Sequence, residues 1–160
     1  MSNYAIEIKN LVKKFDSFTL GPIDLSIPKG TIVGYIGQNG AGKSTTIKLL
    51  LGLLKKDSGE IKILGYDNPN SIELKDKIGV VFDELLVPEE LTLVDLEKFC
   101  SRIYSKWDRE FFYQLKRKFN LSEKQAIKSY SRGMRMKLSM AVALSHNAEI
   151  LILDEATSGL

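Results

Sequence analysis

A cluster of glycines followed by a lysine and a serine is the part of the sequence best suited to chemistry. The stretch GYIGQNGAGKSTTIKLL at 34–50 contains the pattern Gly37-x-x-x-x-Gly42-Lys43-Ser44. Glycines allow backbone conformations that a Cβ would block, so successive N–H groups can turn towards one anion. A helix that begins directly after the loop adds free N–H donors and the positive end of its dipole. This spacing therefore predicts a phosphate-binding loop, or P-loop.

The positions of this loop have distinct expected roles. Lys43 can bring a point charge to the β- and γ-phosphates of a nucleotide, Ser44 is placed to ligate Mg²⁺, and Thr45 can contact the α-phosphate. The alternative is a glycine turn before an ordinary amphipathic helix, but an apolar strand-like run before the loop and helical spacing after it favour the P-loop. The predicted nucleotide-binding residues here are Gly37, Gln38, Asn39, Gly40, Ala41, Gly42, Lys43, Ser44 and Thr45.

A pair of acidic residues near the end of the sequence forms the second candidate site. Four apolar residues at 150–153 precede Asp154 and Glu155, which places both carboxylates at the carboxyl end of an expected buried strand. Open α/β sheets hold ligands at that edge. Asp154 would hold the Mg²⁺ shell, and Glu155 would orient or deprotonate an attacking water. Alone, the pair is equally consistent with a strand end and a helix cap; with the P-loop, Glu155 and Lys43 become the predicted catalytic residues.

The periodicity of the chain predicts the elements that would position these sites. Residues 1–30 alternate like two antiparallel strands, and TIVGYIG at 31–37 looks like a short buried strand entering the loop. Residues 31–87 then form the expected loop-bearing core, 88–145 a mainly helical subdomain that includes a short helix starting at Ser122, and 146–160 the acidic strand. Strands alternating with helices favour an α/β fold with a mostly parallel sheet.

Composition narrows the class of protein. The chain has 160 residues, 44% of them hydrophobic, and a formal net charge of +3 that argues neither for nor against nucleic acid. Cys100 is the only cysteine, which excludes an internal disulfide, and its apolar neighbours at helical spacing predict a core thiol. No run approaches the roughly 18 to 20 apolar residues that span a bilayer. Any membrane role would therefore depend on a partner.

Taken in order, these motifs resemble the nucleotide-binding domain of ATP-binding cassette (ABC) proteins over essentially the whole chain. GQNGAGKST is similar to the family's Walker A, and ILILDEATSGL to its Walker B running into the D-loop. YSRGMRMKLSMAVAL resembles the signature motif and its helix, with Ser131 and Gly133 at the serine and second glycine. The resemblance implies a P-loop NTPase core that binds ATP and Mg²⁺. It also implies a head-to-tail dimer in which Ser131 and Gly133 contact the γ-phosphate held by the opposite subunit.

Four positions differ from the family pattern or leave an alternative open. Phe15 matches the A-loop aromatic that stacks on adenine, but Phe18 is a rival because stacking needs only a flat, accessible ring. Asp83 stands where the family has the Q-loop glutamine; it can ligate Mg²⁺ or water, yet it adds negative charge near a triphosphate. Tyr130 replaces the signature leucine and Arg132 the first glycine, and such versions look like those of bacterial exporter ATPases.

The resemblance implies an ATP-binding and ATP-hydrolysing subunit that powers transport, in the direction of export, through a separate membrane permease. It would be cytoplasmic, peripheral on the inner face of the membrane, and without a nucleic-acid partner. The sequence stops at Leu160, before the family's D-loop aspartate and switch histidine, so we expect a piece of a longer cassette with little activity alone. Two alternatives are a soluble cassette ATPase acting on ribosomes or DNA and a non-hydrolysing regulatory module. The sequence does not indicate the transported compound.

Overall fold

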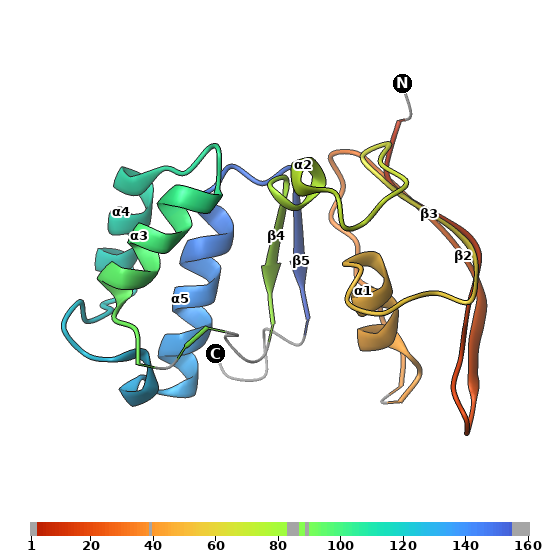
Figure 1. Ribbon diagram of the computed structural model, residues 1–160, viewed down its shortest axis with the longest axis horizontal. Coiled ribbons are helices and arrows are strands. Elements are labelled where there is room, and N and C mark those ends of the chain that lie inside the picture. The colour runs from red at the N-terminus through yellow and green to blue at the C-terminus, as the bar shows by residue number, and fades with distance from the viewer. Residues whose placement is uncertain (1–2, 39, 83–86, 89, 155–160) are drawn as a thin grey trace. The chain divides into compact units, whose positions relative to one another are not determined.

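The computed structural model describes residues 3–38, 40–82, 87–88 and 90–154, and the chain divides into two compact units (Figure 1). Unit 1 is Met1–Lys75 and contains the glycine-rich loop. Unit 2 is Asp76–Leu160 and contains the signature-like segment and the acidic strand end. The two units are described separately.

Unit 1 is built on a three-stranded antiparallel sheet in the order β2–β1–β3. The strands are β1 (Tyr4–Lys14), β2 (Thr19–Pro28) and β3 (Ser58–Ile63). Ile6 and Ile8 are buried, whereas the alternate residues of β1 point to the other face. An irregularity of the register between Ile8 and Leu11 brings Leu11 into the core as well. The predicted antiparallel pair at 1–30 is confirmed, and β3 adds a third strand that the sequence reasoning did not identify.

One helix of unit 1 follows the glycine-rich loop. It is α1 (Lys43–Leu50), which lies beside one face of the sheet (Figure 1) and buries Thr46, Leu49 and Leu50. A second helix, α2 (Ile72–Lys75), is a single turn with Leu74 buried. The predicted order of loop and helix is therefore confirmed.

The strand predicted at 31–37 is wrong. Residues 31–38 belong to no strand among the residues that the structure describes, and the side chains of Ile32 and Ile36 are exposed. A strand exists only through a ladder of backbone hydrogen bonds to a neighbour. The antiparallel sheet of unit 1 does not include this segment, so the apolar pattern alone is not sufficient to make it a strand.

Three α-helices in the described part of unit 2 pack around a common core. They are α3 (Leu93–Ile103), α4 (Arg109–Lys118) and α5 (Arg132–Leu144), which confirms the predicted helical region at 88–145. Side-chain oxygens of Thr92, Asp108 and Ser131 cap their N-termini. Buried residues of all three helices meet in one cluster: Leu93, Leu96, Cys100, Phe112, Leu115, Leu121, Ile127, Tyr130, Leu138 and Ala141.

The short helix predicted to start at Ser122 is wrong. The segment instead forms a 3-10 turn, η1 (Ile127–Ser129). The Ile127 N–H donates to the carbonyl of Leu91 at 2.8 Å, and Ala126 forms an isolated bridge with Thr92. Because the backbone here bonds across to the segment before α3, it cannot form the local ladder of a regular helix.

The acidic strand pairs in parallel with a strand from earlier in unit 2. These strands are β5 (Ile150–Leu153) and β4 (Ile78–Val81), and α5 packs against β4 through Val81, Met136 and Ala143. The predicted parallel strand is thus confirmed. The expectation that it is covered on both faces is not, because Leu151 and Leu153 remain 42% and 50% exposed.

The cysteine and the histidine of the chain both lie in the interior of unit 2. Burial, followed by the charge of Glu97, raises the pKa of Cys100 to about 12, so its thiol stays protonated as predicted for a core residue. His146 follows α5 and is buried; its ring stacks on Tyr104, with 4.0 Å between centroids. Its nitrogens lie 3.1 Å from the Val142 carbonyl and 3.2 Å from the Ile78 carbonyl, so this residue links α5 to β4.

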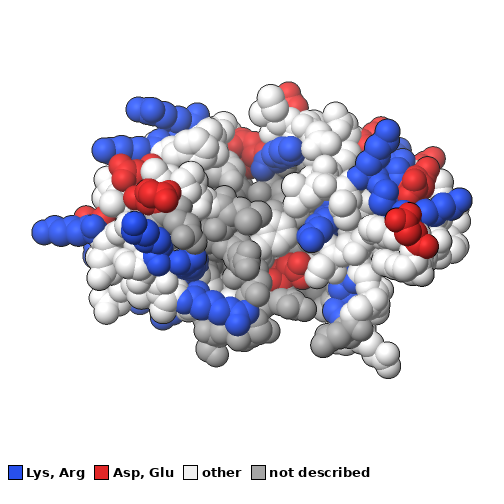
Figure 2. Space-filling model, turned by 60° about the horizontal axis from the view of Figure 1, so that its bottom comes forward, with Lys and Arg blue, Asp and Glu red and all other residues white. Residues whose placement is uncertain are grey.

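The surface carries charges of both signs. Lys and Arg side chains lie beside Asp and Glu side chains on the face shown in Figure 2. Lys62 and Asp67 are one ion pair of the structure, with 3.5 Å between Nζ and Oδ1. Within the described part of the chain, no helix has the length and apolar character needed to cross a membrane.

Candidate phosphate-binding site

The glycine-rich loop of unit 1 has the backbone geometry that the motif predicts. Gly40 and Gly42 have φ angles of 82° and 89°, in the left-handed region that side chains disfavour. Space is restricted at only one of them. A Cβ added to Gly42 would lie 2.4 Å from Leu20 Cδ1, whereas a Cβ added to Gly40 would meet nothing within 4 Å. Gly42 therefore combines an unusual conformation with close packing against β2.

The N-terminus of α1 is arranged to present backbone donors. Gly42 is its N-cap residue, and a glycine has no side chain with which to cap the first N–H groups. The first turn also contains no acidic residue. The positive end of the helix dipole and the amides of the loop therefore favour an anion at this position.

Lys43 lies over the same loop. Its Nζ donates to the carbonyls of Gly37, at 2.5 Å, and Gln38, at 2.9 Å. An ammonium group has three donors, so this side chain can hold the loop and still reach a further acceptor above it. The geometry places a positive charge beside the loop amides, which suits a polyphosphate.

The side chains behind the loop fix its position in unit 1. The Thr46 hydroxyl donates to the Gly42 carbonyl at 2.9 Å and lies 3.4 Å from the Tyr35 hydroxyl. Thr46 is buried, whereas Ser44 and Thr45 are only partly buried and therefore reach the loop surface. Thr46 and Leu20 are positioning residues that sequence reasoning missed. Alternation within β2 marks Leu20 as buried, but its contact with Gly42 depends on the tertiary fold.

The signature-like segment in unit 2 has its own well-defined N-terminus. Ser131 caps α5 by accepting a hydrogen bond from the Met134 N–H at 3.2 Å. An accepting hydroxyl still carries a proton that it can donate, so the cap and a phosphate contact are compatible. Gly133 lies in the first turn of α5, beside the N–H groups that begin the helix.

Two residues hold the backbone before Ser131. Tyr130 is buried and its hydroxyl donates to the Ser122 carbonyl; burial raises the pKa of this tyrosine, so it remains a neutral donor. Arg135 donates from Nη2 to the Lys128 carbonyl at 2.9 Å and from Nε to the Tyr130 carbonyl at 3.3 Å. Arg135 was not identified from sequence; its position four residues after Ser131, one turn into the helix, was the available signal.

The remaining predicted ligands are only partly described. The Asp154 N–H donates to the Val81 carbonyl at 3.0 Å, so Asp154 directly continues the parallel pair of β4 and β5. Asn39, Asp83 and Glu155 lie outside the described residues. Lys43 and Ser44 belong to unit 1, and Ser131, Gly133 and Asp154 to unit 2, so the structure describes these two sets separately.

The donor types suit a magnesium ion that is shared with phosphate. Within the described ranges, no three His, Cys, Asp or Glu residues cluster as a protein-only metal site. Mg²⁺ usually takes one or two protein oxygens and fills its other positions with phosphate oxygens and water. The hydroxyl of Ser44, beside the loop of unit 1, is an oxygen donor of this kind.

The two aromatic rings predicted as rivals form a single pair. Phe15 and Phe18 stack with 4.7 Å between centroids and 15° between planes, at the turn that joins β1 to β2. Both are partly exposed, at 37% and 47%, so neither is a core residue of the sheet. Either ring is accessible to a base, and the sequence alternative between them stays open.

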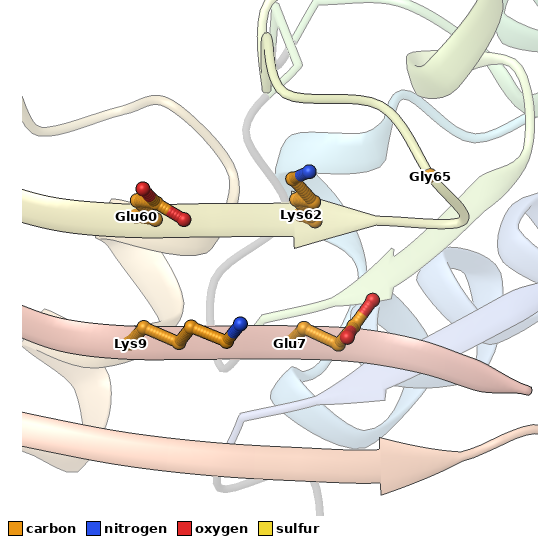
Figure 3. A pocket seen from close by; sticks show the side chains of 5 residues that line it. All are labelled: Glu7, Lys9, Glu60, Lys62 and Gly65. Carbon is orange, nitrogen blue, oxygen red and sulfur yellow. The ribbon is translucent and has the colours of Figure 1, made fainter. Parts of the chain in front are cut away.

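A hollow of about 320 Å³ lies elsewhere, on the outer face of the sheet in unit 1 (Figure 3). Glu7 lies opposite Lys62 and Lys9 opposite Glu60, so charges alternate in sign across β1 and β3. Opposite charges at facing positions stabilise neighbouring strands. Because carboxylates and ammonium groups are equal in number, this surface does not select an anion, and we interpret it as the solvated face of the sheet.

The chain is similar to known proteins over nearly its whole length. The sequence profile described as ABC transporter matches residues 20–158. The lantibiotic transport ATP-binding protein SrtF of Streptococcus pyogenes is 35% identical over 158 residues, which cover 97% of this chain and 68% of that protein. The uncharacterized ABC transporter ATP-binding protein YdbJ of Bacillus subtilis is 32% identical over 164 residues, or 53% of its length. The chain thus spans about half of that relative.

The fold is also similar to that of a solved protein structure. A solved structure of an ATP-binding subunit of an ABC transporter matches with a TM-score of 0.84 and 27% sequence identity. The match covers 98% of this chain and 68% of that one. The predicted fold class, a P-loop NTPase core that combines an antiparallel and a parallel sheet with helices, is confirmed by this likeness and by the two sheets described above.

Proposed function

Because the chain belongs to the ABC transporter family, we propose that it is the ATP-hydrolysing part of a transporter's nucleotide-binding subunit. The observation that carries this proposal is the N-terminus of α1, where Gly42 leaves the helix amides uncapped by a side chain and Lys43 lies over the loop. Such a cradle binds polyanions through backbone donors and a point charge. The nucleotide is ATP, as for the ATP-binding relatives of this family.

The loop residues divide the binding of the triphosphate among them. The amides of the loop would donate to the β- and γ-phosphates, Lys43 would neutralise their charge, and Thr45 would contact the α-phosphate. Ser44 and Asp154 would hold Mg²⁺, with Asp83 as a further candidate ligand. The ion would supply charge neutralisation at the oxygens of the transferred phosphoryl group.

Hydrolysis requires a base and a second subunit. Glu155 directly follows Asp154 at the end of β5 and would take the proton of the attacking water. Ser131 and Gly133 would donate to the γ-phosphate held by another copy, so two chains meet head to tail. The hydroxyl of the α5 cap and the amides behind it are donors of the required kind.

The resulting closure would drive a separate membrane permease. The protein would then be cytoplasmic and peripheral to the membrane. The relative SrtF is described as a lantibiotic transport protein, which supports export as the direction. The chain's signature-like YSRGM, with Tyr130 anchored in the core, is the second reason for this choice.

Substitution of Glu155 by Gln tests the catalytic assignment. In the full-length protein with its partners, we expect ATP turnover to fall by about 100-fold or more, since a positioned general base contributes at least that factor. ATP affinity measured by calorimetry should remain. Unchanged turnover would refute the role of Glu155, and an absence of turnover in the parent protein would favour a regulatory module.

Copurification from native membranes tests the assignment to a transporter. We expect a protein with several apolar spans to be recovered with the chain. Recovery of ribosomes or DNA in its place would contradict the proposal.

A further inference from the structure

Both ring nitrogens of the buried His146 face backbone carbonyl oxygens. Its Nδ1 lies 3.1 Å from the carbonyl oxygen of Val142, and its Nε2 lies 3.2 Å from that of Ile78. The residue is only 1% exposed, so it lies in the interior of unit 2. A neutral imidazole carries a proton on one nitrogen, whereas an imidazolium donates from both. The neutral ring would therefore leave one nitrogen lone pair against a carbonyl oxygen, and only the charged ring satisfies both contacts.

The Val142 contact lies at the negative end of the α5 dipole. The last four carbonyls of a helix have no partner within it, and Val142 is among them. Residues 140–144, which form the last turn, are all apolar and supply no positive charge. A charged histidine close to a helix C-terminus is favoured by the dipole, most strongly where solvent is excluded. His146 is in this position, two residues after α5 ends at Leu144.

The Ile78 contact lies on β4. Carbonyls along a strand alternate between its two edges, and the preceding carbonyl, of Lys77, accepts an N–H group of β5 at 3.1 Å. The Ile78 carbonyl therefore points away from β5, towards His146. A Cβ added to Gly79 would lie 2.7 Å from the carbonyl oxygen of Ala143 in α5. His146 thus joins the end of the helix to the strand where the two elements are in direct contact.

The groups around the ring suit a positive charge. Tyr104 stacks on it with 4.0 Å between centroids and 14° between planes, and burial raises the pKa of Tyr104, so its own ring stays neutral. A cation beside an aromatic face is attracted by the quadrupole of that ring. Hydrogen bonds from Ser105, followed by the charge of His146, lower the pKa of Asp76, so this carboxylate is an ionised partner.

The other titratable groups on the neighbouring elements are neutral or engaged elsewhere, and β4 and β5 themselves carry no charged side chain. Lys77 and Glu149 form an ion pair at 3.0 Å. The charge of Lys106 acts on Asp76, and the Asp108 carboxylate accepts the Phe111 N–H at the start of α4. The titratable and charged side chains on the elements around His146 are Asp76, Lys77, Cys100, Tyr104, Lys106, Asp108 and Glu149.

We propose that His146 is an imidazolium that donates to both carbonyls and thereby acts as a pH-sensitive positioning residue between α5 and β4. The start of α5 carries Ser131 and Gly133, and β4 pairs with β5, which leads to Asp154. Loss of one proton from the ring removes one of the two hydrogen bonds between these elements. Alkaline conditions therefore weaken the link between the signature-like helix and the acidic strand end, whether or not the chain hydrolyses ATP.

The charge of this ring can be measured directly, because the chain contains a single histidine. At pH 7.5 only about a tenth of unperturbed histidine carries the second proton. In the ¹⁵N-labelled chain at this pH, we expect NMR to show similar ¹⁵N shifts for Nδ1 and Nε2, the signature of an imidazolium. A neutral ring separates the two shifts widely, and that spectrum at pH 7.5 would overturn the proposal.

Asp76→Asn removes the ionised partner but keeps an oxygen for Ser105. In this variant the two ¹⁵N shifts should separate at a lower pH than in the parent. The matched control is Glu123→Gln, which removes a carboxylate of unit 2 that pairs with Lys116 at 2.6 Å, and it should leave the His146 titration unchanged. The same titration in both variants would show that the ring is not charged beside Asp76, which contradicts the proposal.

His146→Gln tests the consequence for the fold, because its amide is neutral at every pH. In chemical unfolding at pH 6, the folding equilibrium constant of the parent should exceed that of the variant by about 10-fold or more, the effect of a hydrogen bond from a charged donor. Above about pH 6.5 the unfolded chain loses its proton first, so this advantage should shrink as the pH rises. An equal advantage at pH 6 and pH 9 would overturn the proposal. The spectrum of the parent decides the question even if this variant does not fold.

Discussion

The helices that follow the two phosphate-related motifs begin in opposite ways. In unit 1, α1 starts from Gly42, a left-handed residue that cannot cap. In unit 2, α5 starts from Ser131, whose hydroxyl accepts the Met134 N–H, and α3 and α4 have capped starts as well. A cap satisfies one of the N–H groups that every helix leaves unpaired.

This difference between the two helix starts suits one of them to ligand binding and the other to stabilising its helix. A capped start stabilises the helix that it opens, and the caps of unit 2 belong to helices whose buried faces form a shared core. An uncapped start after glycines leaves donors for an external anion, at the cost of local stability. Substitutions at the two starts should therefore affect different measurements.

The largest effect should come from Gly42→Ala. The added methyl group would be in a left-handed conformation and 2.4 Å from Cδ1 of the buried Leu20, so we expect the loop to be disturbed and charged hydrogen bonds to phosphate to be lost. We expect ATP affinity to fall by about 100-fold or more, as measured by calorimetry. Gly40→Ala is the matched control, because it has the same backbone strain with open space around it; its loss should be nearer 10-fold. Equal losses of ATP affinity in the two variants would show that the packing of Gly42 against Leu20 does not contribute to binding.

The next effect should come from Lys43→Ala. Removing one charged donor to phosphate corresponds to about 10- to 100-fold in ATP affinity. Lys48→Ala, an exposed lysine in the last turn of the same helix, is the control and should have almost no effect. If both variants lost ATP affinity equally, Lys43 would contribute to binding only through the net charge of the protein, and its position beside the loop would not matter.

A smaller and different effect is expected at Ser131. Loss of the α5 cap in Ser131→Ala should reduce stability by about 0.5–2 kcal/mol, seen in chemical unfolding, with ATP affinity of the isolated chain unchanged. Ser131→Asn retains a capping oxygen and should keep the stability. Turnover of the full transporter should fall in both variants, because neither keeps the hydroxyl. Normal turnover in Ser131→Asn would indicate that the residue is only a cap.

The smallest effect concerns the capping box of α3. Hydrogen bonds from the Thr92 side chain and then its backbone lower the pKa of Asp95 below its ordinary value of 3.8. Because the pKa of Asp95 is lowered in the folded state, the ionised carboxylate stabilises the fold above pH 3.8. This stabilisation is lost as the pH falls through the lowered pKa. Thr92→Ala should therefore lower the Tm by a few degrees at neutral pH. The difference in Tm between Thr92→Ala and the parent should shrink in strong acid. Thr92→Ser should have the same Tm as the parent.

Local patterns predicted most of the elements. The glycine spacing, the amphipathic runs of α3 and α4 and the capping residues are short-range features, so the loop, the helices and their starts could be identified from the sequence. The failures at 31–37 and at Ser122 have one cause. Both segments depend on which distant backbone they bond to: η1 bonds to the Leu91 carbonyl, and 31–38 joins no sheet in the described structure.

The sequence by itself determined the chemistry that the protein has available, because the type and spacing of Gly42, Lys43, Ser44 and Ser131 specify donors, a charge and a hydroxyl at helix starts. The tertiary structure alone decided which residues support them. Leu20 of β2 packs against Gly42 of the loop, although the two lie far apart in the sequence. Such a contact joins residues by distance in space, and no local spacing in the chain encodes that distance.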